Sequence, residues 1–318
     1  MTPAAGTQTT YRPTSPLSAP SIRPLLHPTE PSRFALAILA SLFALGLPLI
    51  VIISSGTAAV FGLLLALGSF LASIWFGMQI GKARLLGRSV RVDEHSFPLL
   101  QDVIDEVRST LGYRRRLEIY VCRTGGVEIS STSLLGTRIV LIDGDLLAEL
   151  SEPAKLPQLK FLIGSHVGAM RAKHDRVELL VLIMGWAEVL KYVNLLILPY
   201  YRATAYSGDQ IGATCCADVH AALEVTRRLL VGPKTAGSLR DGAVMPQAML
   251  VKRRILPRLV QLTMPSPHIT NRYANLLCFA RYHDPDWWQA LREAMSEREA
   301  HQLDAIWRRS PYARVPGA

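Results

Sequence analysis

The feature that most constrains this chain is a long segment without any charged side chain, from Phe34 to Ile80. A short break at residues 54–57, Ser-Ser-Gly-Thr, divides it into two apolar halves, Phe34–Ile53 and Ala58–Ile80. Each half has about the length that crosses the hydrocarbon core of a bilayer, roughly 20 residues, and in lipid such a segment satisfies its backbone as a helix. The segment therefore predicts a transmembrane helical hairpin over residues 33–82.

The charges on either side of this hairpin predict its orientation. Basic residues flank both ends, and the turn between the helices has none; they are Arg12, Arg23 and Arg33 before the hairpin and Lys82, Arg84, Arg88 and Arg91 after it. Because basic flanks stay in the cytoplasm, we expect a multi-pass protein of the inner (cytoplasmic) membrane with both termini in the cytoplasm. A cleaved signal peptide is the alternative, and the long polar leader and the second apolar run disfavour it.

The composition fits a membrane protein with a cytoplasmic region. Hydrophobic residues make up 49% of the 318 residues and charged residues only 19%. The four cysteines lack the spacing of a zinc finger or a disulfide framework, which favours reduced thiols in the cytosol. The net charge is +10, with basic clusters at residues 114–116 and 252–254. At an inner leaflet such clusters favour anionic lipid or solvent, so the bilayer is an expected partner and nucleic acid is not.

The rest of the chain divides into a tail and a domain. Residues 1–32 are rich in Pro, Thr and Ser and are expected to be a disordered tail. Residues 92–318 are expected to form a cytoplasmic domain with two or three strands and many helices. Strands are predicted at Leu117–Cys122 and Ile139–Ile142, and helices at Phe97–Leu111, Leu146–Leu150, Lys160–His174, Val177–Leu198, Ala213–Leu230, Met249–Leu262 and Asp286–Arg308. This order predicts an α+β, mostly helical fold with a small sheet.

The helix predicted at Val177–Leu198 has two interpretations. It is apolar enough to be a third membrane span. It also contains Glu178, Glu188, Lys191 and Asn194. A charged side chain at mid-membrane costs several kcal/mol on insertion, roughly 3 kcal/mol each, which favours a core or interfacial helix.

Residues 160–174 carry the most informative motif. They read Lys-Phe-Leu-Ile-Gly-Ser-His-Val-Gly-Ala-Met-Arg-Ala-Lys-His. A helical metallopeptidase site uses H-E-x-x-H, in which two His one turn apart chelate zinc and the Glu polarises the attacking water. The frame resembles the site helix of the HtpX-like and CAAX-prenyl-protease-like membrane zinc metallopeptidases, which are gluzincins with a pattern similar to L-x-H-E-L-G-H-I-x-x-x-H. The resemblance places the two ligand positions on Ser165 and Ala169 and the general base on His166, and it retains Gly164, Gly168 and His174.

Two further segments carry the same resemblance. Residues 205–212 read Ala-Tyr-Ser-Gly-Asp-Gln-Ile-Gly, which is similar to the family's E-Y-S-A-D-R-x-G. The third ligand position is then Ala205, and the supporting acid is retained as Asp209. Residues 266–272, Ser-Pro-His-Ile-Thr-Asn-Arg, are similar to H-P-x-x-x-x-R, so that Pro267 and Arg272 are retained. The resemblance covers about residues 34–279 and implies a zincin-like metallopeptidase domain.

The resemblance also implies that the chemistry is lost. Two alanines and a serine do not bind zinc, and without the Glu no metal-activated water forms. No cofactor is therefore expected. The alternative is a relocated zinc site, for which the candidate ligands are His166, His174, Asp209 and His220.

Three functions follow, of which the first is the leading hypothesis. The protein is expected to be a membrane-anchored pseudopeptidase that binds or regulates another membrane protein. Its contact would be a groove along an edge strand around Glu128–Val140, or a surface at Trp287 and Trp288, of which only one ring can face the core. The second is an active membrane metalloendopeptidase with a non-standard ligand set. The third is a structural subunit of a membrane assembly, packing through its hairpin.

Overall fold

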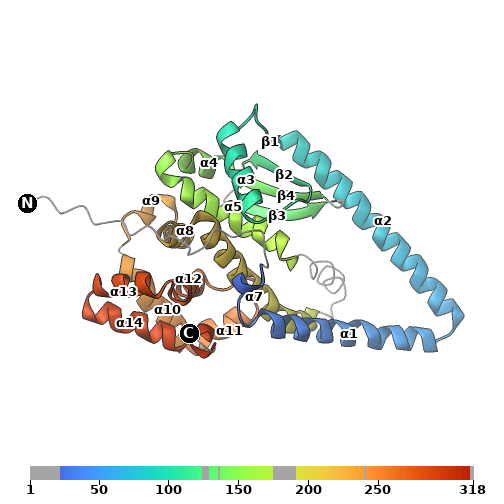
Figure 1. Cartoon of the computed structure of the whole chain (residues 1–318). Helices are drawn as coiled ribbons and strands as arrows, with labels where there is room; N and C mark the ends of the chain where they lie inside the picture. Colours follow the sequence, from blue (N-terminus) through green and yellow to red (C-terminus); the bar gives the residue numbers. More distant parts are fainter. Residues whose placement is uncertain (1–21, 124–128, 135–136, 175–190, 240, 316–318) are drawn as a thin grey trace, which may run out of the picture.

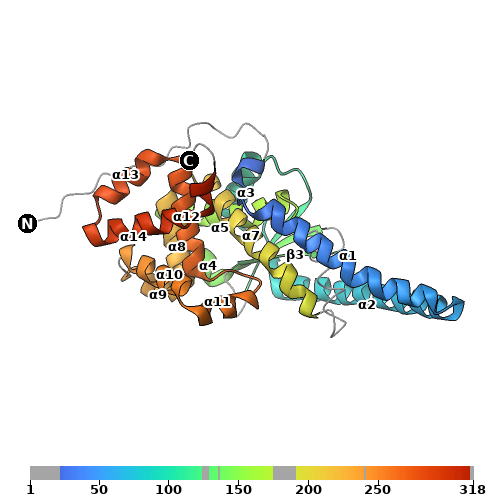
Figure 2. The same ribbon diagram turned by 90° about the horizontal axis from the view of Figure 1, so that it is seen from below.

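The computed structural model describes residues 22–315, except residues 124–128, 135–136, 175–190 and 240. It is mostly helical with one small mixed sheet, as the sequence predicts (Figure 1). The N-terminal helices form a hairpin that projects from the remaining elements (Figures 1 and 2).

The hairpin consists of α1 (Glu30–Ser54) and α2 (Thr57–Arg88), and both helices are long and apolar enough to cross a membrane. Gly56 makes the turn with a φ of 99°, a left-handed conformation that suits glycine. No residue of α2 is buried, and large apolar residues on its surface are exposed, such as Phe61 at 71% and Leu65 at 68%. An exposed apolar surface of this extent indicates association with a membrane. The helix α2 continues beyond the predicted end of the hairpin at residue 82 and carries the basic residues up to Arg88.

The expected tail of residues 1–32 is wrong from residue 22 onward. A 3-10 helix, Arg23–Leu25, precedes α1, and Leu25 and His27 are buried. Leu25 packs in the hydrophobic core, and the backbone N–H of His27 donates to the distant Ser207. The local amino-acid composition does not reveal such contacts. Residues 1–21 lie outside the described residues.

The sheet has four strands in the order β1-β2-β4-β3: β1 (Ser89–Arg91), β2 (Leu117–Cys122), β4 (Thr137–Asp143) and β3 (Ile129–Leu134). The pair β2–β4 is parallel, and β1 and β3 pair antiparallel at the two edges. The two predicted strands are confirmed as β2 and β4. The predicted edge at Glu128–Val140 needs correction, because β4 is an inner strand and β3 alone forms that edge. Glu128 lies outside the described residues.

The remaining helices pack against the sheet and against one another. In chain order they are α3 (Pro98–Thr110), α4 (Gly144–Leu150), α5 (Leu156–Arg171), α7 (Lys191–Cys216), α8 (Val219–Val231), α9 (Pro233–Ala236), α10 (Val244–Arg253), α11 (Ile255–Leu262), α12 (Ile269–His283), α13 (Pro285–Glu293) and α14 (Glu297–Arg308). The predicted segment Val177–Leu198 lies largely outside the described residues, and α7 begins at Lys191.

Three predicted helices are each interrupted. The segment Ala213–Leu230 breaks at Ala217, whose φ is 52°, and Asp218 then caps the first turn of α8. The segment Met249–Leu262 breaks at Arg254, which is extended. The segment Asp286–Arg308 breaks before Ser296, which forms a capping box with Glu299. Side-chain caps supply partners for free backbone groups, so the caps at Asp218 and Ser296 begin a new helix where periodicity alone predicts continuity.

The helices α5 and α7 pack against each other at glycines. A Cβ on Gly168 would lie 2.3 Å from Cγ2 of Ile211, and a Cβ on Gly164 would lie 2.7 Å from Cβ of Cys215. Real Cβ atoms do not approach other atoms this closely, so the glycines permit the backbones to approach. The residues that the resemblance places on α5 are thereby held next to those on α7.

The first half of α7 packs on α1. Ala37 and Ala44 of α1 form a small buried cluster with Ile197 and Tyr200 of α7, and Phe34 lies 5.3 Å from Tyr200 between ring centroids. The guanidinium of Arg33 donates to the carbonyl oxygen of Pro199 at 3.2 Å. The hairpin is therefore attached to the same helix that carries Ala205 and Asp209.

Candidate functional site

One cavity of about 760 Å³ brings the three sequence segments together. Its lining includes Ser165, His166 and Ala169 from α5. The lining also includes Ala205 and Asp209 from α7, Ser266 from the segment before α12, Arg272 from α12 and Ser131 from β3. Positions that are more than a hundred residues apart in the sequence thus share one cavity. The other retained residues lie beside it, with Gly164 and Gly168 in the α5–α7 contact and Pro267 buried just before α12.

The centre of this cavity offers few donors for a metal. Ala169 and Ala205 present methyl groups, and the hydroxyl of Ser165 donates to the carbonyl oxygen of Leu162 at 2.8 Å. Nδ1 of His166 lies 3.1 Å from the hydroxyl of Ser131 on β3. Burial, and next the charge of Arg272, lower the pKa of His166 to about 4. His166 is therefore a neutral imidazole at physiological pH.

An ion pair between Arg272 and the buried Asp209 lines the cavity. Nε of Arg272 donates to Oδ2 of Asp209 at 2.8 Å, and Nη2 donates to Oδ1 at 2.6 Å. The Asp209 side chain is only 1% exposed, and that of Arg272 is 24% exposed. Such a two-pronged arrangement holds both groups in one geometry and cancels their charges. The ion pair fixes α12 to α7 across the cavity.

A second polar network, which sequence reasoning missed, joins the cavity to the start of the hairpin. His174 lines the cavity, and its Nε2 lies 3.0 Å from Oε1 of buried Glu30. The hydroxyl of Ser207 donates to the other oxygen of Glu30 and accepts from the backbone N–H of His27 at 2.8 Å. Glu30 is the first acidic residue of the chain, and the next is Asp93. In the sequence, the available signal for this network was an isolated carboxylate just before the apolar run.

The predicted helix Lys160–His174 ends earlier than the sequence indicates, so that His174 lies beyond it. The helix α5 ends at Arg171, and Lys173 takes a left-handed φ of 61°. This turn directs the chain away from the helix axis, and His174 pairs with Glu30 instead.

This N-terminal network predicts a loss of stability in acid. Burial, and next the charge of Arg33, lower the pKa of His27 to about 4. The unfolded chain binds a proton on His27 below about pH 6.5, whereas the folded chain does so only near pH 4. Stability is therefore complete above pH 6.5 and falls as the pH drops to 4, by about 3 kcal/mol for this group. Thermal unfolding of full-length protein in detergent across this range measures the effect.

The matched variants for this experiment are His27→Phe and His301→Phe. Phenylalanine keeps a ring against Tyr206 without a titrating group. The His27→Phe variant should show a flatter decline of Tm between pH 6.5 and 4. The exposed His301→Phe should decline as the parent protein does. Equal slopes for all three proteins would refute the assignment.

His220 and the tryptophan pair lie outside the cavity. His220 is on α8, and its Nε2 accepts from Nε1 of Trp287 at 3.4 Å. Trp288 packs on Trp307, and Arg281 lies over its ring. Trp287 is 5% exposed and Trp288 is 3% exposed, so the expected docking surface at these residues is wrong. Trp287 lies against His220 of α8, and Trp288 lies against Trp307 of α14.

The residues at the mapped ligand positions do not fit zinc. In the part of the chain that the structure describes, no three His, Cys, Asp or Glu side chains form a group that could hold a metal ion. The alternative donors are also engaged: His166 with Ser131, Asp209 with Arg272, and His174 with Glu30. A metal would have to break these contacts to bind.

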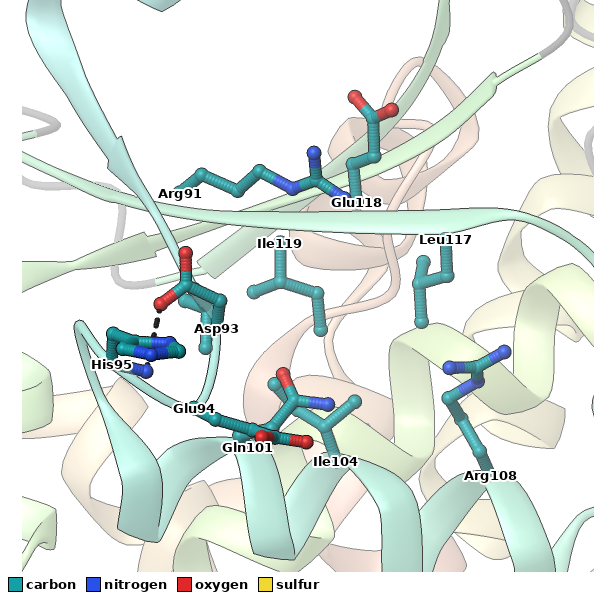
Figure 3. A pocket seen from close by; sticks show the side chains of 11 residues that line it. Arg91, Asp93, Glu94, His95, Gln101, Ile104, Arg108, Leu117, Glu118 and Ile119 are labelled. Carbon is teal, nitrogen blue, oxygen red and sulfur yellow. Dashed lines mark hydrogen bonds between the residues drawn. The ribbon is translucent and has the colours of Figure 1, made fainter.

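A separate cavity of about 340 Å³ lies between α3 and the strands β1 and β2 (Figure 3). Ile104 of α3 and Ile119 of β2 point toward each other there (Figure 3). Its acidic groups have local partners, since Asp93 accepts from the backbone of His95 at 2.9 Å and Glu118 accepts from Arg116 at 2.8 Å. This polar hollow presents no constellation comparable to that on α5 and α7.

Comparisons with known proteins give no family assignment. No family model matches the chain, and neither a curated protein nor a solved structure matches it. The fold and the cavity are therefore inferred from the sequence and structure of this chain alone.

Proposed function

We propose that this protein is a membrane-anchored pseudopeptidase with a zincin-like domain, which holds an extended segment of another membrane protein without cutting it. The observation that supports this most is the cavity on α5 and α7, which adjoins an edge strand and carries non-ligating residues at the three mapped ligand positions. The resemblance to HtpX-like peptidases supplies the expectation that such a groove takes an extended chain.

The strand β3 offers the peptide a place to pair. Among the described residues, β3 pairs with β4 only, so no described strand occupies its other side. Ile129 and Ser131 of β3 line the cavity, while Thr132 between Ser131 and Ser133 faces the other way by strand alternation. Adding a strand supplies main-chain hydrogen bonds, and alternate side chains of the peptide then enter the cavity.

The interior of the cavity favours apolar side chains of the ligand. Leu162, Met170 and Leu229 contribute to its wall. The neutral His166 and the mutually compensated Asp209 and Arg272 add little net charge. A segment with apolar residues at alternate positions suits this lining, because alternate side chains of an extended peptide point to the same side.

The hairpin would place this groove at a membrane. We infer that α1 and α2 cross the cytoplasmic membrane as a multi-pass anchor with both termini in the cytoplasm, because the basic residues lie at the two outer ends of the hairpin. The contact between α1 and α7 then keeps the cavity close to the inner leaflet.

Peptide binding to purified full-length protein in detergent tests the proposal. The probes are fluorescent decapeptides with alternating apolar residues, selected from a random library. For each binder, N-methylation at alternate residues should abolish binding in one register and spare it in the other, because only one set of N–H groups faces β3. Equal effects in both registers would contradict strand addition.

Variants of the protein complete this test. Ala169→Leu should fill the cavity and lower peptide affinity by about tenfold, since roughly 1–2 kcal/mol of side-chain burial is lost. The matched control is Ala154→Leu at an exposed position outside the cavity, which should bind as the parent does. If both leucine variants bind equally, the peptide does not use this cavity.

Cleavage and metal content separate the alternatives. Mass spectrometry of the bound peptides should recover them intact. Elemental analysis of protein purified without chelator would support the metalloendopeptidase alternative if it found stoichiometric zinc that His166→Ala abolishes. Exchanging α2, of which no residue is buried, for an unrelated apolar helix should leave peptide binding unchanged, whereas a structural subunit that packs through its hairpin would lose its partner.

A further inference from the structure

The helix α11 presents an apolar face to the outside of the molecule. Ile255 is 72% exposed and Leu256 is 74% exposed, and Leu259, Val260 and Leu262 are about half exposed. These residues share one side of the helix by their spacing. Gln261, on the opposite side, accepts from Asn271, and Pro257 accepts from His268. The polar side of α11 therefore faces the protein, and the apolar side has no cover among the described residues.

Positive charge surrounds this face. Arg253, Arg254 and Arg258 are exposed next to it or on it. The chain has no acidic residue between Asp241 and Asp284. A short helix with one apolar side and arginines on its border is typical of segments that lie in the interface of an anionic bilayer.

The attachment of α11 places it near the membrane boundary of the hairpin. Nη1 of Arg202 on α7 donates to the carbonyl oxygens of Gln261 at 2.9 Å and Met264 at 2.9 Å, which fixes the C-terminal end of α11. Arg202 lies one turn along α7 from Pro199, which accepts from Arg33. Arg33 is the last charged residue before the apolar run of α1. Arg202 and Arg33 therefore attach the end of α11 and the start of the apolar run to positions on α7 that are three residues apart.

We propose that α11 is an interfacial helix that inserts its apolar face into the headgroup region of an anionic lipid bilayer. Ile255, Leu256 and Leu259 contact the upper acyl chains. The guanidinium groups of Arg253, Arg254 and Arg258 bind lipid phosphates. This contact goes beyond peptide binding, and it gives the domain a second attachment that fixes its orientation on the membrane.

Fluorescence quenching in lipid nanodiscs tests this contact. Full-length protein, at one copy per disc, carries the environment-sensitive amino acid dansylalanine in place of Leu259. The disc lipids are phosphatidylcholine with or without phosphatidylglycerol, plus a trace of lipid with a nitroxide on its acyl chain. We expect a blue-shifted emission and strong quenching in discs with phosphatidylglycerol, and weaker quenching without it. Dansylalanine at exposed Arg298 on α14 is the control and should remain unquenched.

Charge reversal provides the matched variants. Arg253→Glu with Arg254→Glu should reduce quenching at position 259 to the level of the Arg298 control. Arg114→Glu with Arg115→Glu removes the same charge from the other arginine cluster and should leave quenching at position 259 unchanged. These arginines are exposed, so circular dichroism should show both variants folded. Quenching at 259 no stronger than at 298, or independent of phosphatidylglycerol, would overturn the proposal and leave the face for a second copy or another protein.

Discussion

Replacing Arg272 by Met lowers the free energy of unfolding by about 3–5 kcal/mol, the largest effect that we expect for a single substitution in this protein. Methionine keeps much of the apolar volume of the arginine side chain, so the loss arises from the charge. The Asp209 carboxylate, which is 1% exposed, would remain buried without the guanidinium that now donates to both of its oxygens. An unpaired buried charge is costly because the interior does not replace its hydration.

Thermal or denaturant unfolding of full-length protein in detergent measures this effect. The double variant Asp209→Asn with Arg272→Met removes both charges and should recover a large part of the lost stability. A double variant no more stable than Arg272→Met alone would show that the ion pair is not the cause. Both residues line the cavity, and Arg272→Met leaves an unpaired Asp209 carboxylate there. Arg272→Met should therefore weaken the binding of apolar peptides more than the double variant does.

Replacing Gly212 by Ala is the second large effect, a net loss of about 1–3 kcal/mol from overpacking. A Cβ at this position would lie 2.6 Å from the carbonyl oxygen of Phe161 on α5. This oxygen belongs to the backbone of α5, so α5 itself has to move. Alanine also gains helix propensity of about 1 kcal/mol over glycine, which offsets only part of this cost.

Gly208 is the matched control, because it lies one turn earlier on the same helix. A Cβ there would lie 3.4 Å from the carbonyl oxygen of Ser165, close to ordinary contact. Gly208→Ala should therefore be neutral or slightly stabilising in the same unfolding experiment. If both variants lost the same stability, the close approach of α5 and α7 would not explain the result for Gly212.

Local sequence patterns predicted the helices and strands that form because of residues near one another in the sequence. The absence of charge between Phe34 and Ile80 predicted two long apolar helices, and α1 and α2 confirm them as candidate spans. The alternation in Leu117–Cys122 and the apolar run Ile139–Ile142 predicted β2 and β4. The strand β3, rich in serine, has no such pattern and was not predicted as a strand of its own. Its pairing with β4 is decided by the neighbouring strand.

The sequence by itself determined which residues would be compared with a zinc site, and only the tertiary structure decided which of them meet. Ser165, Ala169, Ala205, Asp209 and Arg272 share one cavity, whereas His220 lies against Trp287 elsewhere. The pairing of Glu30 with His174 joins residues 144 positions apart in the sequence and leaves no periodic trace. Periodicity records which side of an element is apolar, because burial acts on each element separately. The partner that covers that side depends on how all elements pack together, and that information belongs to the folded chain as a whole.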